Sequence, residues 1–141
     1  MNTCGLGYIA VYSHNGRIGA MVQFYCNDSF TTRTEEFKEL ANSIAMQVAG
    51  ADPKVISVGE LDAEIRNKEL EKAKKINEKK SEKEFKEAME FWSHKINQEN
   101  CLLAQPYVKD PTKTVAELIK EFEDKYGVKI SIDRFIRYEI N

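Results

Sequence analysis

The chain has 141 residues, a length that fits one domain and allows a sizeable core. Its 21 basic and 23 acidic residues leave a net charge of −2, so no global positive field is available to hold nucleic acid. Three widely spaced cysteines (Cys4, Cys26 and Cys101) form no Cys-x-x-Cys pair, which indicates reduced thiols in the cytoplasm and argues against zinc or redox motifs. No apolar run reaches the ~18–20 residues of a membrane span, and residues 1–5 have neither the basic region nor the apolar core of a signal peptide.

Residues 8–25 predict a β-hairpin centred on Asn15-Gly16. This dipeptide tolerates the positive φ angles that both turn positions of a tight hairpin require. After the turn, one face of the second strand carries Ile18, Ala20, Val22 and Phe24.

An amphipathic helix is expected to begin at about Arg33. Thr32 and Glu35 have the spacing of a capping box. Gly50 and Pro53 are expected to end the helix. Its apolar face is formed by Phe37, Leu40, Ala41, Ile44, Ala45 and Val48.

The stretch from residue 60 to residue 99 predicts a helical hairpin that turns at residues 77–80. Ser57 and Glu60 mark the first start, and Ser81 and Glu84 mark the second. Between them the chain is dense in glutamate and lysine, a pattern typical of a solvated helix face. The first helix has only a thin apolar stripe, made by Leu61, Ile65, Leu70, Ala73 and Ile76. The second has a clearer apolar face, made by Phe85, Ala88, Met89, Trp92 and Ile96.

Residues 100–111 are expected to be a loop, because Pro106 and Pro111 disfavour regular structure. Thr114 and Glu117 then open a last helix, and Gly127 follows its end. A final strand is predicted over residues 128–140. One of its faces is expected to carry Val128, Ile130, Ile132, Ile136, Tyr138 and Ile140, with Phe135 breaking the pattern on the polar side.

The two ends of the chain therefore supply one sheet, and the middle supplies helices. The predicted fold class is α+β, with a three-stranded antiparallel sheet made of hairpin 8–25 and strand 128–140. This sheet packs against helices. The helical hairpin at 60–99 is an insertion in a single domain that spans residues 1–141.

The residues that could carry out catalysis form no motif. Only His14 and His94 could serve as imidazole bases, and no local motif places either of them beside a cysteine. The chain has no glycine-rich phosphate-binding motif and no cluster of metal ligands. It is expected not to be an enzyme, to need no cofactor or metal, and to act on another protein. A Cys/His enzyme is the weakest alternative.

The polar turn between the second strand and the first helix has one large apolar residue, Phe30, at its centre. A turn of this kind lies on the surface, where binding residues are often held by a rigid scaffold. Phe30 either packs onto the first helix near Phe37 as a hydrophobic staple or is exposed as a wedge for a partner.

The stretch from Cys26 to Phe37 resembles the signature segment of the bacterial translation elongation factor Ts family, Cys-Glu-Thr-Asp-Phe-Val-Ala-Arg-Asn-Glu-Glu-Phe. Two more stretches, His14–Gly19 and Leu103–Asp110, resemble the family in the same order. Ser29 stands where the family has an aspartate. The positions that match are Cys26, Phe30, Arg33, Glu35, Glu36 and Phe37.

The resemblance implies a guanine nucleotide exchange factor that binds elongation factor Tu, the GTPase that carries aminoacyl-tRNA, and promotes GDP release. In the family, the Asp-Phe pair enters the GTPase near its nucleotide site, and the phenylalanine wedges between two helices. The resemblance and the position of Phe135 on the polar side of the last strand lead us to expect a homodimer joined through the sheet. The charge balance, the lack of a long apolar run and the unpaired cysteines predict a cytoplasmic protein without direct contact to nucleic acid or membrane. The partner-binding residues would be Asn27, Asp28, Ser29, Phe30, Thr31 and Arg33.

Two departures from the family lead us to expect weaker binding and exchange. The aspartate is lost at Ser29, and nothing matches the family's usual amino-terminal helical domain with its Leu-Arg-x-x-Thr-Gly-Ala-Gly type segment. The chain would then be a naturally short homologue or a trimmed one. The alternative function is an elongation factor Tu-binding or assembly module without exchange activity, such as a phage-encoded homologue.

Overall fold

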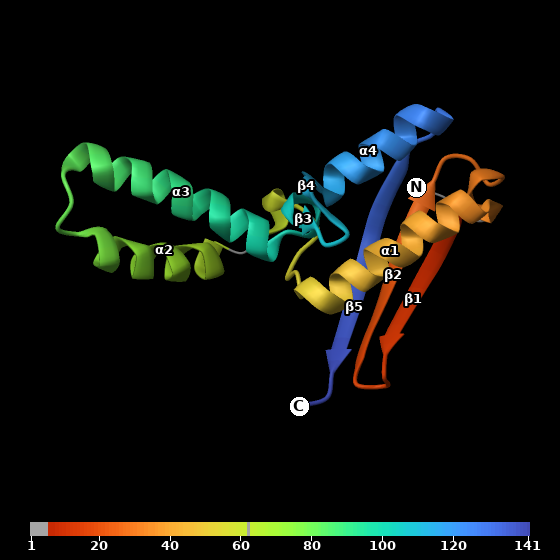
Figure 1. Ribbon diagram of the computed structural model, residues 1–141, viewed down its shortest axis with the longest axis horizontal. Coiled ribbons are helices and arrows are strands. Elements are labelled where there is room, and N and C mark those ends of the chain that lie inside the picture. Colours follow the sequence, from red (N-terminus) through yellow and green to blue (C-terminus); the bar gives the residue numbers. More distant parts are fainter. Residues whose placement is uncertain (1–5, 62) are drawn as a thin grey trace. The chain divides into compact units, whose positions relative to one another are not determined.

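The computed structural model describes residues 6–61 and 63–141, which divide into two compact units (Figure 1). The first unit comprises the described residues up to Asp52 together with Pro106–Asn141. The second unit is Pro53–Gln105. A single domain over residues 1–141 stays a prediction, and Cys4 lies outside the described residues.

The first unit is built on a three-stranded antiparallel sheet. Strands β1 (Gly7–His14), β2 (Ile18–Cys26) and β5 (Ile130–Glu139) lie in the order β1-β2-β5. Asn15 and Gly16 have φ angles of 55° and 68°, and the N–H of Arg17 donates to the carbonyl of His14 over 3.0 Å. The predicted hairpin and the α+β fold class are confirmed.

One face of this sheet is covered by helix α1 (Glu35–Ala51) and carries the core of the unit (Figure 1). Val22 and Phe24 of β2 are buried against Phe37 and Ile44 of α1. The Phe37 ring meets the rings of three neighbours edge-on, with centroid distances of 5.5–6.0 Å: Tyr8, Phe24 and Phe122. Phe122 comes from helix α4 (Val115–Tyr126), so this aromatic cluster ties α4 to α1 and the sheet.

The start of α1 differs from the prediction. Thr34 is the N-cap, and its hydroxyl accepts the N–H of Phe37 over 3.2 Å. Thr32 lies inside a 3₁₀ turn, Thr31–Arg33, whereas Thr34 has the extended backbone that an N-cap requires. The end differs in part: the helix stops at Ala51, just before Pro53, but Gly50 is helical and Asp52 takes the left-handed position with a φ of 48°.

The alternation predicted for β5 is wrong beyond Ile132. The β2–β5 register shifts between Gln23 and Phe24, which pair with Arg134 and Ile132, so Asp133 is an extra bulge residue. A one-residue insertion exchanges the two faces of a strand. Phe135 therefore pairs with buried Val22 and shares its face, while three apolar side chains turn to the open face: Ile136, Tyr138 and, just after the strand, Ile140.

The predicted loop at residues 100–111 contains a second, small sheet. Strands β3 (Pro106–Tyr107) and β4 (Asp110–Thr114) pair antiparallel. A sheet of two strands has only edge strands, and an edge strand tolerates the missing N–H of Pro106 and Pro111. The predicted start of α4 is confirmed, because Thr114 and Glu117 form a full capping box.

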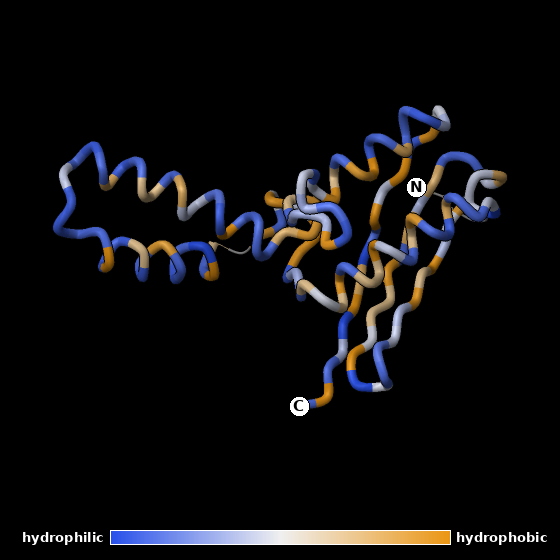
Figure 2. Tube along the Cα trace, viewed as in Figure 1, coloured by the Kyte–Doolittle hydropathy of each residue, from blue (hydrophilic) through white to orange (hydrophobic). Residues whose placement is uncertain are grey.

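The second unit is an antiparallel helical hairpin made of α2 (Ala63–Asn77) and α3 (Glu82–Asn100), as predicted. Ser81 caps α3 by accepting the N–H of Glu84 over 3.3 Å. Arg66 links the helices by donating to Asn97 over 2.6 Å and to Ser93 over 3.3 Å. Figure 2 shows a largely hydrophilic hairpin with scattered apolar positions.

The apolar stripe predicted for the first helix of the hairpin is only partly correct. Ala73 is buried, but Ile65 is exposed and Ile76 is 73% exposed. The Ser57–Glu60 start is also not a helix start, because Val58–Glu60 forms a separate 3₁₀ turn. Within the described part of the chain, each helix is too short or too polar to span a bilayer.

Candidate partner-binding turn

The turn that joins β2 to α1 is anchored at its first residues. Cys26 is fully buried, and its N–H donates to the carbonyl of Leu6 over 2.9 Å. Asn27 makes two bonds to the backbone of Lys129: its N–H donates over 3.1 Å and its side-chain oxygen accepts over 2.9 Å. The side chain of Asn27 thus fastens the turn to the residue before β5.

Asp28 organises the centre of the turn. One carboxylate oxygen accepts the N–H of Phe30 over 3.2 Å, and the other accepts the hydroxyl of Thr31 over 2.6 Å. The Thr31 hydroxyl holds the pKa of the Asp28 carboxyl below its ordinary value, and the Phe30 N–H adds to this effect. The ionised form of Asp28 therefore stabilises the turn.

Three threonines complete the hydrogen bonding. The Thr32 hydroxyl donates to the carbonyl of Ser29 over 2.8 Å, and the Thr34 hydroxyl donates to the carbonyl of Thr31 over 2.7 Å. Thr31 and Thr32 are buried. The predicted site residues thus divide into two groups: Asn27, Asp28 and Thr31 hold the turn, and Ser29, Phe30 and Arg33 present exposed side chains.

Phe30 is 72% exposed, so it is not a staple. The place beside Phe37 that a staple would occupy is taken by the surrounding rings of Tyr8, Phe24 and Phe122. The exposed ring is what the wedge interpretation requires, although a role in binding stays a prediction.

The two cysteines that the structure describes do not resemble activated nucleophiles. Cys26 and Cys101 are both fully buried, and burial raises the pKa of each thiol. A reactive thiol needs the opposite shift and access to solvent. No group of three potential metal ligands occurs among residues 6–61 and 63–141.

Gln47 is a positioning residue that the sequence interpretation missed. It is 1% exposed, its amide N–H donates to the carbonyl of Pro106 over 3.1 Å, and its oxygen accepts the N–H of Val108 over 2.8 Å. These bonds fasten the β3–β4 turn, part of the Leu103–Asp110 stretch, to α1. Its position in the sequence, between Ile44 and Val48 of the apolar face, was the signal that could have predicted its burial.

Comparison with known proteins decides the family. The sequence profile of the family described as Elongation factor TS matches residues 2–141. The chain belongs to the elongation factor Ts family. This confirms the resemblance of the Cys26–Phe37 stretch and supports an elongation factor role in protein biosynthesis.

Relatives named Elongation factor Ts are similar along almost the whole chain. The one from Moorella thermoacetica is 39% identical over 137 residues, which are 95% of this chain and 68% of the relative. The one from Desulforamulus reducens is also 39% identical, over 95% of this chain and 63% of the relative. The one from Caldanaerobacter subterraneus subsp. tengcongensis is 40% identical over 97% of this chain and 70% of the relative. The chain thus spans about two thirds of the length of these relatives.

Proposed function

We propose that this elongation factor Ts family member binds elongation factor Tu through the turn at residues 27–33 and promotes the release of GDP. The observation that carries the proposal is Phe30, which is 72% exposed on a turn fixed by side-chain hydrogen bonds at Asn27, Asp28 and Thr31. A large apolar ring on a rigid support loses little conformational freedom on binding, which favours a hot spot. The protein acts as an exchange factor rather than an enzyme, in the cytoplasm and without a cofactor of its own.

The mechanism is a reciprocal coupling between two binding events. If the Phe30 ring separates two elements of the GTPase that hold GDP, the exchange factor and GDP weaken each other by the same factor. Burying the exposed part of one phenylalanine contributes ~1–2 kcal/mol, and ~1.4 kcal/mol corresponds to tenfold in a rate or equilibrium constant. A single ring can therefore supply a substantial part of the exchange effect.

The second candidate function, binding without exchange, is favoured by the chemistry at Ser29. The family's carboxylate is absent there, and the neighbouring Asp28 already accepts a hydrogen bond inside the turn with each of its oxygens, which orients its charge toward Phe30 N–H and Thr31. A partner that needs this charge for GDP release would be bound without being activated.

One experiment separates the two functions. Elongation factor Tu loaded with fluorescent GDP is mixed with the protein, and both complex formation and nucleotide release are followed. Faster release supports the exchange factor, and a complex with unchanged release supports the assembly module. If no complex forms at high micromolar concentration, both candidate functions are ruled out.

We further propose a two-fold dimer through the open face of the sheet. The strands leave apolar side chains uncovered there, including Val11 at 60% and Tyr138 at 71% exposure. A hollow of about 300 Å³ on this face is lined in part by Ile9, Met21 and Ile136. Contiguous apolar surface of this kind marks interaction sites.

A further inference from the structure

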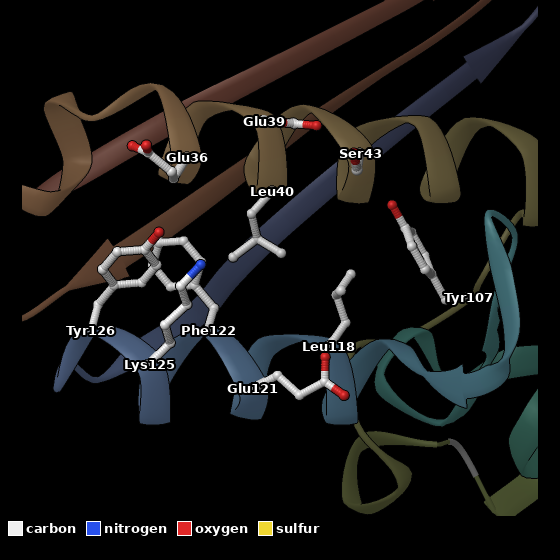
Figure 3. Close-up of a pocket in the computed structure, with 10 residues that line it drawn as sticks. All are labelled: Glu36, Glu39, Leu40, Ser43, Tyr107, Leu118, Glu121, Phe122, Lys125 and Tyr126. Carbon is white, nitrogen blue, oxygen red and sulfur yellow. The ribbon is translucent and has the colours of Figure 1, made fainter.

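The first unit has a second surface feature, separate from both the turn and the open face of the sheet. It is a groove of about 310 Å³ between α1 and α4, which we call the α1/α4 groove. Figure 3 shows its walls: Glu36, Glu39, Leu40 and Ser43 come from α1, while Leu118, Glu121, Phe122, Lys125 and Tyr126 come from α4, with Tyr107 at one end.

The floor of the groove is apolar. Leu40 and Leu118 point toward each other across the gap (Figure 3), and Tyr107 is buried at one end. Tyr126, on the α4 wall, is 40% exposed. Apolar and aromatic lining with a few polar groups at the edge is the usual composition of a binding groove.

The edges of the groove are acidic. The lining contains three carboxylates, Glu36, Glu39 and Glu121, against one ammonium group, Lys125. Glu121 is paired with Lys113 over 2.9 Å, and Lys125 lies 5.3 Å from the centre of the Tyr126 ring. Within the part of the chain that the structure describes, Glu36 and Glu39 make no ion pair. Among the described residues, the α1 edge therefore carries two carboxylates without an ion-pair partner beside an apolar floor.

The spacing of the lining residues defines the shape of an occupant. On α1 they lie at positions 36, 39, 40 and 43, and on α4 at 118, 121, 122, 125 and 126. Each wall is thus one helical face of about two turns, roughly 10–12 Å long. Two parallel walls of this length accept a third helix, whose own contact residues repeat at three- and four-residue spacing.

We propose that the α1/α4 groove binds a short amphipathic helix of a partner protein, with apolar residues facing the floor and lysine or arginine residues facing Glu36 and Glu39. Charge complementarity selects this occupant, because an acidic helix would place like charges against Glu36 and Glu39 on the α1 edge. The proposal goes beyond the function of the Phe30 turn, since no residue of the groove belongs to the exposed set on that turn.

The test uses the full chain and two fluorescein-labelled helical peptides. Both carry leucine at i, i+3, i+4 and i+7. The remaining positions are rich in lysine in one peptide and in glutamate in the other. Fluorescence anisotropy is expected to show saturable binding of the lysine peptide only, with affinity that falls as NaCl is raised from about 50 to about 300 mM.

Matched variants locate the binding. Glu36→Gln/Glu39→Gln is expected to weaken the lysine peptide about fivefold to tenfold. Leu118→Gln, on the floor, is expected to weaken it about tenfold. Glu35→Gln is the matched control, because it removes a negative charge from the first turn of α1 at a position that does not line the groove. This variant should bind the lysine peptide with nearly unchanged affinity.

Several results would overturn the proposal. These are no saturable binding of the lysine peptide, equal binding of the glutamate peptide, or equal loss in Glu35→Gln and the double variant. Light scattering of the free protein gives a further check. Self-association that disappears in Glu36→Gln/Glu39→Gln would show that a second copy fills the groove, which would also refute a separate partner. Thermal melting of each variant confirms that it is folded.

Discussion

Replacing Phe30 by alanine separates the two roles that this ring could have. Phe30 is 72% exposed, so only about a quarter of its surface is buried in the free protein. Full burial of a phenylalanine side chain is worth ~1.5–3 kcal/mol, and the change should therefore lower the free energy of unfolding by only ~0.4–0.8 kcal/mol. The melting temperature is expected to fall by no more than about 3 °C.

The effect on the partner should be larger. Removing the exposed ring takes away ~1–2 kcal/mol of burial in the complex, and a central hot spot can exceed this value. We expect the dissociation constant for elongation factor Tu and the rate of GDP release each to worsen about tenfold to thirtyfold. Isothermal titration calorimetry measures the first quantity, and stopped-flow release of fluorescent GDP measures the second.

Phe91→Ala is a matched control, because Phe91 is also a phenylalanine and is 63% exposed, but it lies on α3 in the second unit. It should leave GDP release unchanged. The wedge interpretation is refuted if Phe30→Ala lowers the free energy of unfolding by more than ~1.5 kcal/mol and leaves binding and release at the level of the unmodified protein.

Four more predictions follow from the same structure. Ser29→Asp, which restores the family's carboxylate, should raise the rate of GDP release if the lost charge limits activity; an unchanged rate would assign the deficit to another position. The lowered pKa of Asp28 means that its contribution to stability is complete above the ordinary carboxyl value of 3.8 and is lost as the pH falls through the lower folded value. Asp28→Asn should therefore flatten the decline of the melting temperature with acid, and an identical pH profile would contradict this. Val11→Lys on the open sheet face should convert a dimer to a monomer in light scattering, whereas a monomeric unmodified protein at high micromolar concentration would rule out the dimer. Shortening the hairpin by about two turns near residues 77–80 should preserve cooperative melting, because the buried cluster of Leu61, Ile96 and Cys101 lies away from that turn; loss of the transition would count against it.

Local signals in the sequence were sufficient wherever the structure depends on neighbouring residues. Asn15-Gly16 predicted the hairpin because both residues tolerate positive φ, and both adopt it. Thr114 and Glu117 predicted the start of α4 because a capping box needs only four consecutive residues. The Cys26–Phe37 stretch identified the family for the same reason, since its residues are contiguous.

Other features were decided by contacts between residues far apart in the chain. The bulge at Asp133 depends on the register between β2 and β5, and it alone determines that Phe135 faces the core while Ile136 faces outward. Burial of Gln47 depends on a turn about sixty residues away.

The exposure of Phe30 shows most clearly what the sequence alone could not determine. The sequence predicted a large apolar ring in a surface turn, but it did not determine whether that ring packs on α1 or lies in solvent. The tertiary structure chose between them, because Tyr8, Phe24 and Phe122 from three different elements already surround Phe37 and leave the Phe30 ring in solvent. A sequence pattern specifies which face of an element is apolar, whereas packing in three dimensions determines which of those apolar residues find a neighbour.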